Sequence, residues 1–230
     1  MLVVSNIDLT AKSNVIKPSK FLKSLTRDFT VNINNDYRYM KAGYYVSLHA
    51  EILGSQVIPS SEDIIDTSRP PILLLRAARA GIPTLPFIVT DSIRRITSEL
   101  GFPVVVLAVN PFIHDGYKIA KNRSALYRAV KSLGMNYKFA VCAQPLKGKM
   151  NTLKTIFGKC EGTEEEKTIA GRVYSTFKIP VCRLHVQKAE NRVYLAGLQP
   201  LPKNEVTMFD RRTISEEISR ISEQGEHISG

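Results

Sequence analysis

The stretch DYRYMKAGYYVSLHAEILGSQVIPSS, residues 36–61, combines four tyrosines with a helical repeat of apolar residues. Tyr45, Leu48 and Ile52 fall at i, i+3 and i+7, so they would share one face of a short amphipathic helix. The helix is expected from about residue 41 to residue 53. Gly54 follows where helices commonly end in a left-handed conformation. A short buried segment ending in a turn is expected at residues 57–59.

A second face of this predicted helix carries polar groups. Tyr44, Ser47 and Glu51 have the same spacing and supply a phenol, a hydroxyl and a carboxylate. Two interpretations stay open: the solvent-facing side of a packed helix, or a recognition surface. Arg38, which lies between two tyrosines, favours recognition, because guanidinium and aromatic side chains offer planar donors and stacking faces.

The same stretch resembles a known family. The motif consists of Tyr37-Arg38-Tyr39, Gly43 to Leu48, Ala50-Glu51, Gly54 and Pro59-Ser60. It looks like the signature of the domain that precedes the catalytic part of certain RimK-like ATP-grasp ligases. A second group of residues resembles the closing strand–helix–strand of that domain: Ile156-Phe157-Gly158, Ile169-Ala170, Val173-Tyr174, Phe177 and Ile179-Pro180. The resemblance covers about half of the chain.

This resemblance implies a role in substrate presentation. Ligases of this kind join an amino acid or amine to a carboxylate through an acyl phosphate. The implied partner is a separate ATP-grasp ligase chain, and the implied substrate is an acidic peptide or a small acidic molecule. The residues expected to contact the substrate or partner are Tyr37, Arg38, Tyr39, Tyr44, Tyr45, Ser47, Glu51 and His114.

Residues 68–146 also resemble the nucleotide-binding part of an ATP-grasp enzyme in outline. RAARAGIPTLP (76–86), ELGFPVVVLAV (99–109) and SALYRAVKSLG (124–134) follow the order found in that family. The chemistry differs, since Leu107 and Ala108 stand where the family has a phosphate-binding lysine. Gly116 replaces a glycine-rich loop, and residues 196–200 replace a Glu-x-Asn magnesium site. We therefore expect no catalysis by this chain alone and no cofactor, with ATP and magnesium as a less supported alternative.

The net charge of +11 is concentrated in the middle of the chain. Residues 67–149 contain thirteen lysines and arginines but only three acidic residues, a balance that attracts phosphate-rich or carboxylate-rich partners. The candidate basic patch is Arg76, Arg79, Arg94, Arg95, Lys118, Lys121 and Arg123. These residues form either one functional patch or the solvated faces of several helices. An RNA- or ribosome-binding protein is the second functional hypothesis, although no RRM or KH motif is present and the aromatics of residues 37–45 lie outside the basic region.

Other classes of protein and site have little support in the sequence. No apolar run approaches the roughly 18 residues of a membrane span, and no signal peptide is expected. Three widely spaced cysteines without CxxC argue against a disulfide scaffold or a zinc site. We therefore expect a cytoplasmic protein without a membrane partner. His114, beside Asp115, is the best loop candidate for a site, with a plain turn as the alternative. His185 alternates with Leu184 and Val186, so it is expected on the surface of a sheet.

The predicted fold class is α/β, with two small α/β lobes, a mixed or mostly parallel sheet and an ATP-grasp-like outline. The lobes are residues 1–66, for recognition, and 67–202, a degenerate ATP-grasp-like part. Residues 203–230 are expected to form a polar tail in which Ile214, Ile218 and Ile221 recur at helical spacing. The tail is either a docking helix or partly disordered. Strands are expected at 2–4, 29–33, 85–89, 104–109 and 138–143, and a hairpin is expected at 181–186 and 192–198. The valine-rich run 104–109 is expected to be buried on both faces. Helices are expected within 11–28, at 72–80, 93–100 and 124–133, and after a capping box at Thr163.

Overall fold

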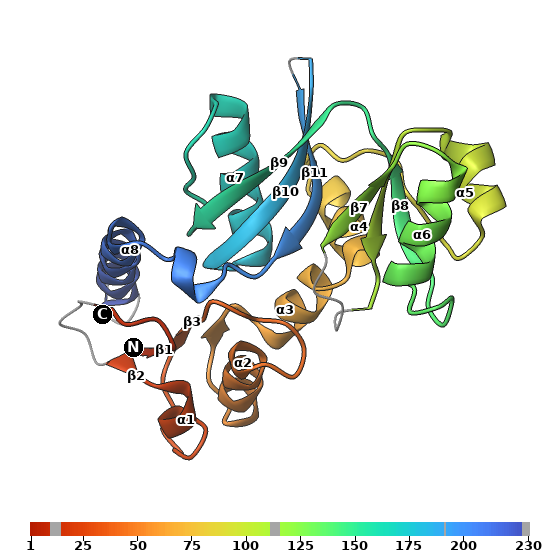
Figure 1. The fold of residues 1–230 in the computed structure, drawn as a ribbon. Coiled ribbons are helices and arrows are strands. Elements are labelled where there is room, and N and C mark those ends of the chain that lie inside the picture. Colours follow the sequence, from red (N-terminus) through yellow and green to blue (C-terminus); the bar gives the residue numbers. More distant parts are fainter. Residues whose placement is uncertain (10–14, 111–115, 191, 227–230) are drawn as a thin grey trace.

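Three β-sheets stand side by side, and helices cover their faces (Figure 1). The structure is a computed structural model that describes residues 1–9, 15–110, 116–190 and 192–226. The expected α/β class is confirmed. The named strands of the first sheet pair in parallel, and those of the other two sheets pair antiparallel, with an isolated parallel bridge between Thr84 and Leu195.

The first sheet is built from the N-terminal part of the chain. Its strand order is β2 (Val15–Ile16), β1 (Leu2–Ser5), β3 (Thr30–Ile33) and β4 (Val57–Ile58). Alternate residues of β1 face opposite sides, so Leu2 and Val4 pack against α1 (Pro18–Phe21) and α2 (Ala42–Ile52), whereas Val3 belongs to the core on the other face. The helix expected within residues 11–28 is limited to α1, a single turn of four residues that begins at a proline.

The second sheet lies in the centre of the molecule. It has the order β11 (Arg192–Gln199), β10 (Val181–Ala189) and β9 (Lys149–Ile156). Helices α3 (Ser61–Thr67), α4 (Pro70–Arg79) and α7 (Glu164–Phe177) contribute to its core. The predicted capping box of α7 is confirmed: Thr163 Oγ1 accepts from the Glu166 backbone N–H, and the Glu166 carboxylate accepts from the Thr163 N–H at 2.8 Å.

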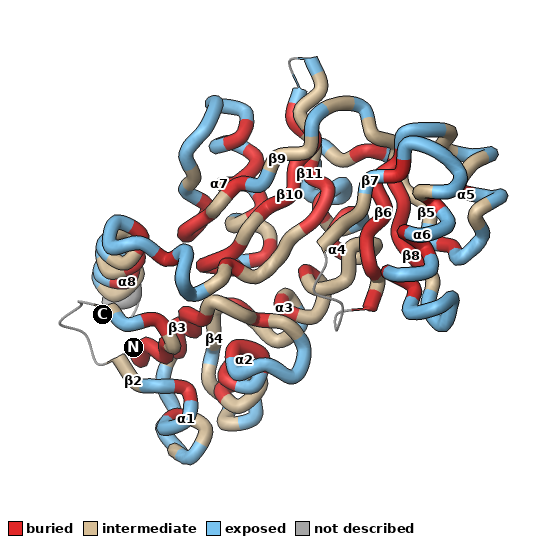
Figure 2. The backbone as a smooth tube through the Cα atoms, viewed as in Figure 1, coloured by how far each residue is buried: buried red, intermediate tan, exposed pale blue. Residues whose placement is uncertain are grey.

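The third sheet carries the valine-rich run predicted as a strand buried on both faces. Its order is β5 (Ile88–Thr90), β8 (Val141–Pro145), β6 (Val104–Ala108) and β7 (Tyr117–Ala120). Val104 and Val106 pack in the core formed with α5 (Ile93–Leu100) and α6 (Arg123–Leu133). Val105 and Leu107 pack with Leu74 of α4 on the opposite face. The prediction is confirmed, and Figure 2 shows the burial of β6 and β8.

Residues 208–226 of the polar tail form a helix. The short 3-10 helix η1 (Lys203–Glu205) leads into α8 (Met208–Glu226). Ile214 and Ile218 of α8 share a core with Val3 of the first sheet and Ile156 of the second. The docking-helix alternative is therefore confirmed, and the two ends of the chain pack together. The division at residue 66 stays a prediction.

Five of the described elements were not predicted: β2, α3, β7, β9 and η1. The sequence contains a helix-start signal for α3, because serine is a favoured N-cap residue and two acidic residues follow Ser60 in the first turn. In the structure, the Ser60 side chain accepts a hydrogen bond from the Asp63 N–H. Strands β7 and β9 mix polar and apolar residues without a clear alternation, so pairing alone reveals them. Within the described ranges, no helix is both long enough and apolar enough to cross a membrane.

Candidate functional site

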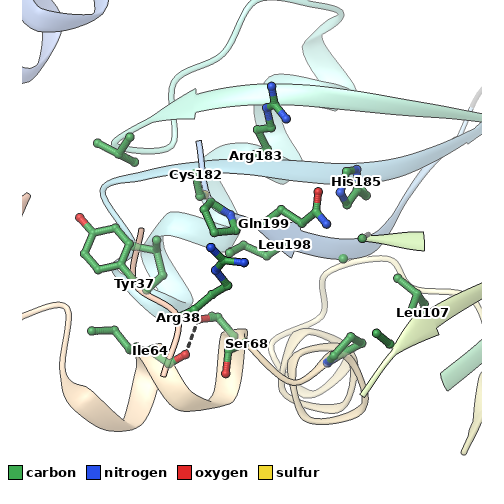
Figure 3. Close-up of a pocket in the computed structure, with 18 of the residues that line it drawn as sticks. Tyr37, Arg38, Ile64, Ser68, Leu107, Cys182, Arg183, His185, Leu198 and Gln199 are labelled. Atoms are coloured by element: carbon green, nitrogen blue, oxygen red, sulfur yellow. Dashed lines mark hydrogen bonds between the residues drawn. The ribbon is translucent and has the colours of Figure 1, made fainter. Parts of the chain in front are cut away.

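A cavity of about 270 Å³ lies where the three sheets approach one another. Its wall combines the segment before α2, the turn between α3 and α4, the end of β6, the start of β10 and the end of β11 (Figure 3). The polar side chains in this wall include Arg38, Ser68, Asn110, Arg183, His185 and Gln199. Residues that are far apart in the sequence therefore share one concave site, the usual setting for ligand binding.

Arg38 and Tyr37 are the predicted recognition residues that line this cavity among the described residues, and Arg38 is the charged one. Its Nε lies 3.0 Å from Asp36 Oδ1 and its Nη2 lies 2.6 Å from Asp36 Oδ2, so the two planar groups pair side by side. Burial would raise the pKa of Asp36, but the hydrogen bonds and charge of Arg38 outweigh it, and that pKa is lowered. The pair fixes the guanidinium at the cavity wall.

His185 is buried in the same wall, with only 5% of its surface exposed. Its Nδ1 lies 3.1 Å from Thr152 Oγ1, whereas its Nε2 has no hydrogen-bond partner within the described residues. Burial lowers the pKa of the imidazole, the nearby Gln199 side chain opposes this shift, and the charge of Arg183 adds to it. The ring is therefore neutral near neutral pH.

The sequence placed His185 on the surface of a sheet, and this prediction was wrong. Its sheet face is covered by the third sheet, because the Tyr117 ring of β7 packs edge-on against the imidazole at 4.9 Å between centroids. The alternation Leu184-His185-Val186 indicated a strand but carried no information about what covers each face.

The positions that depart from ATP-grasp chemistry meet at one point of the cavity. A Cβ added to Gly197 would lie 3.3 Å from Leu107 Cδ2 and 3.6 Å from the His185 ring. Leu107 stands at the expected lysine position, and Gly197 lies within the segment expected to hold magnesium. Both therefore line the same wall.

The donor set of this wall does not match a magnesium nucleotide. None of its described lining residues is Asp or Glu, whereas magnesium prefers hard oxygen ligands, commonly carboxylates. Among the residues with assigned positions, no group of three or more His, Cys, Asp and Glu could hold a metal. Burial raises the pKa of the lining thiol Cys182 to about 12, so it stays protonated.

The polar row of α2 is directed into the protein. Ser47 is fully buried: its Oγ accepts from Asn32 Nδ2 at 2.8 Å and donates to the Pro59 carbonyl at 2.6 Å. The Glu51 carboxylate accepts from the Ser61 N–H at 2.8 Å, at the start of α3. These contacts give both residues a role in joining α2 to β3 and α3.

The buried face of α2 differs from the predicted one. Tyr45, Leu48 and Ile52 were expected to face the core, but Ile52 is 74% exposed and Tyr45 is exposed as well. Instead, Val46 and Ala50 pack on the first sheet, with Ser47 beside them. Small side chains allow the helix to approach the sheet closely, and Ser47 satisfies the buried Asn32 of β3.

The predicted tyrosines divide between the core and the surface. The Tyr37 hydroxyl accepts from the Asn34 N–H and donates to the Asn32 carbonyl, both at 2.9 Å, while its side chain borders the cavity. Tyr44 packs in the central core, and its ring contacts those of Tyr39 and Tyr45 at 5.2 and 5.6 Å between centroids. His114 lies outside the described residues.

The predicted basic residues occupy several elements. Arg76 of α4 forms salt bridges with Asp63 at 2.8 Å and Asp66 at 2.9 Å, and it stacks over the Phe177 ring. It therefore links α3, α4 and α7. The other predicted members are spread over three parts of the fold. Arg79 lies on α4, and Arg94 and Arg95 lie on α5. Lys118 lies on β7, Lys121 in the turn that follows, and Arg123 at the start of α6.

Several solved structures have a fold similar to that of this chain. The crystal structure of a RimK domain ATP-grasp protein from Sphaerobacter thermophilus DSM 20745 matches with a TM-score of 0.64 and 12% identity, covering 94% of this chain and 98% of that one. D-alanine–D-alanine ligase from Bacillus anthracis matches with a TM-score of 0.66 and 14% identity over 98% and 99% of the two chains. The ATP-grasp ligase PsnB, complexed with precursor peptide PsnA2 and AMPPNP, matches with a TM-score of 0.57 and 14% identity over 86% and 87%. At these identities the likeness shows the fold alone.

The family assignment comes from the sequence match. No curated protein matches the chain. Residues 19–217 match the family model described as the RimK-like ATP-grasp N-terminal domain, which extends the resemblance across both predicted lobes. The chain therefore belongs to the RimK-like ATP-grasp N-terminal domain family.

Proposed function

We propose that this chain is a recognition module, non-catalytic by itself, of a RimK-like ATP-grasp carboxylate–amine ligase system. Its cavity binds an acidic group of a peptide or small molecule, and a separate ATP-grasp chain activates the carboxylate. The observation that carries the proposal is the cavity wall, which presents Arg38, Arg183 and His185 but no carboxylate among its described residues. The carboxylates that pair with the two arginines, Asp36 and Glu205, stand outside that lining. We expect the protein to act in the cytoplasm.

The wall favours recognition over phosphoryl transfer. Transfer of a phosphoryl group depends on cations and metal ions that neutralise charge as it develops. Leu107 is buried and apolar where the family has a lysine, and Gly197 offers no side chain to a metal. A guanidinium supports the binding of a carboxylate instead, because it carries five N–H donors and the Asp36 carboxylate accepts two of them, through Nε and Nη2.

A peptide is compatible with this fold. The PsnB structure of similar fold holds a precursor peptide together with AMPPNP. In the proposed system, this chain retains the peptide-binding task and leaves the nucleotide to its partner.

Calorimetry with two ligands tests the proposal. We expect a hexaglutamate peptide to release or absorb heat and magnesium–ATP to give none. Arg38→Ala should weaken the peptide about 10- to 100-fold, since a hydrogen bond to a charged group contributes about 1.5–3 kcal/mol. Arg79→Ala is the matched control, because Arg79 is an exposed arginine of α4 that does not line the cavity.

Each outcome decides between functions. Binding of magnesium–ATP would favour the alternative function, a divergent ATP-binding ligase. A peptide affinity unchanged by Arg38→Ala would show that the cavity is not the recognition site. Thermal melting of each variant separates lost binding from lost folding. A pull-down from native lysate, with and without nuclease, tests the partner: a nuclease-insensitive ATP-grasp chain is expected.

A further inference from the structure

The stretch from residue 116 to residue 160 contains no acidic residue but ten lysines and arginines. Among the described residues, Lys154 forms a salt bridge with Asp210 and Lys159 forms one with Glu217, both acidic residues of the C-terminal part. On α6 and the segment after it, four have no acidic partner within salt-bridge distance among the described residues: Arg123, Arg128, Lys131 and Lys138. This part of the surface therefore keeps its positive charge.

Helix α6 divides into a packed face and a basic, aromatic face. The buried side chains are Leu126, Ala129, Val130 and Leu133. Arg123, Tyr127 and Lys131 are exposed and fall at i, i+4 and i+8, so they follow one another along the outer side. Each step along the helix axis is about 6 Å. A ring therefore stands between two cations.

The segment after α6 adds two more exposed rings. Tyr127 is 49% exposed and Tyr137 is 37% exposed, and their ring centroids lie 5.9 Å apart with the planes tilted by 57°. Phe139, two residues further on, is 46% exposed. A helix face that contacts only solvent does not require exposed aromatic rings beside cations that lack an acidic partner, so this face has the composition of a binding surface.

The backbone places Tyr137 against α6 at a conformational cost. Met135, Asn136 and Tyr137 have φ values of 51°, 56° and 62°, a left-handed conformation that non-glycine residues seldom adopt in succession. Hydrogen bonds hold the segment there: the Asn136 N–H donates to the Lys131 carbonyl at 2.7 Å, and the Phe139 N–H donates to the Gly134 carbonyl at 3.0 Å.

We propose that Arg123, Tyr127, Lys131, Tyr137 and Phe139, here called the α6 surface, bind single-stranded nucleic acid. Stacking platforms flanked by cations suit unpaired bases and their phosphates. A duplex hides its base faces, and an acidic peptide supplies charge without bases to stack. None of these residues lines the cavity, so the proposal goes beyond the recognition function. Unlike the tyrosines of residues 37–45, Tyr127, Tyr137 and Phe139 lie within the basic region of the chain.

Fluorescence anisotropy with labelled oligo(U) and oligo(dT) of roughly 12 nucleotides tests the proposal. Tyr127→Ala and Tyr137→Ala should each weaken binding at least about fivefold, the lower end for loss of one stacked base. Tyr127→Phe keeps the ring and should bind like the wild type. Arg123→Ala and Lys131→Ala should each reduce the slope of log affinity against log salt by about 0.7. Arg94→Ala, an exposed arginine of α5, should leave the slope close to the wild-type value.

Three results would overturn the proposal. The first is no binding at about 50 mM salt, where phosphate contacts are strong. The second is an affinity for duplex of the same length that equals the single-strand affinity and does not respond to Tyr127→Ala. The third is displacement of the oligonucleotide by polyglutamate as efficiently as by unlabelled oligonucleotide, which would assign the surface to an acidic protein.

Discussion

Replacement of Ser47 by alanine distinguishes a structural role from a recognition role for the polar row of α2. The substitution removes one buried hydroxyl and leaves two groups without it: one Asn32 amide hydrogen and the Pro59 carbonyl. Asn32 Nδ2 keeps its second acceptor, the Gly43 carbonyl at 2.7 Å. The loss is therefore confined to these two contacts.

The expected magnitude follows from the burial of both groups. A buried polar group that loses its partner costs about 1–3 kcal/mol. For two partly compensated groups we expect a loss of about 2–4 kcal/mol in the free energy of unfolding. In a chain of this length that corresponds to a decrease of roughly 5–15 °C in Tm.

Thermal melting and urea unfolding measure this loss, and calorimetry with hexaglutamate measures recognition. Folded Ser47→Ala protein should bind the peptide like the wild type. Ser98→Ala is the matched control, because its Oγ donates to the Arg95 carbonyl on the exposed side of α5, and its effect should stay within about 0.5 kcal/mol. A variant that melts like the wild type but no longer binds the peptide would refute this reasoning and return Ser47 to the recognition surface.

Two further predictions concern pH and packing. Because burial lowers the pKa of His185 in the folded protein, the unfolded chain takes up that proton first, and stability is lost as pH falls below about 6.5. In urea unfolding, the free energy of unfolding of His185→Gln should fall less between pH 8 and pH 5 than that of the wild type. The same fall in both proteins would contradict a neutral, buried imidazole. A Cβ at Gly148 would lie 2.1 Å from the Lys188 carbonyl oxygen, so Gly148→Ala should cost about 1–3 kcal/mol. A Cβ added at Gly171, within α7, would meet no atom within 4 Å, so Gly171→Ala should raise the free energy of unfolding by about 0.5–1 kcal/mol. A higher Tm for Gly148→Ala than for Gly171→Ala would refute the packing at these two glycines.

Local signals in the sequence predicted several elements correctly. The Thr163–Glu166 capping box lies within one turn of helix, and it marks the start of α7 as expected. The valines of β6 indicated burial on both faces, which the cores on either side confirm. Ile214 and Ile218 indicated an apolar stripe, and that stripe docks α8. Each signal depends on residues a few positions apart.

The face of α2 was predicted incorrectly because hydrophobicity alone decided it. The largest apolar side chains suggested a core face through Tyr45 and Ile52, yet the sheet accepts the smaller Val46 and Ala50. The buried Asn32 of β3 required a polar partner, and only pairing across elements reveals that requirement.

By itself, the sequence determined the helices and strands with strong periodicity, the concentration of positive charge and the family motif around residue 38. Tertiary structure alone decided which residues share a site. It placed Leu107 against Gly197, covered His185 with the ring of Tyr117, and set Tyr137 beside Tyr127. The physical reason is that a periodic pattern fixes the direction of a side chain relative to its own helix or strand. What each face meets depends on elements that are distant in the chain and pack against it.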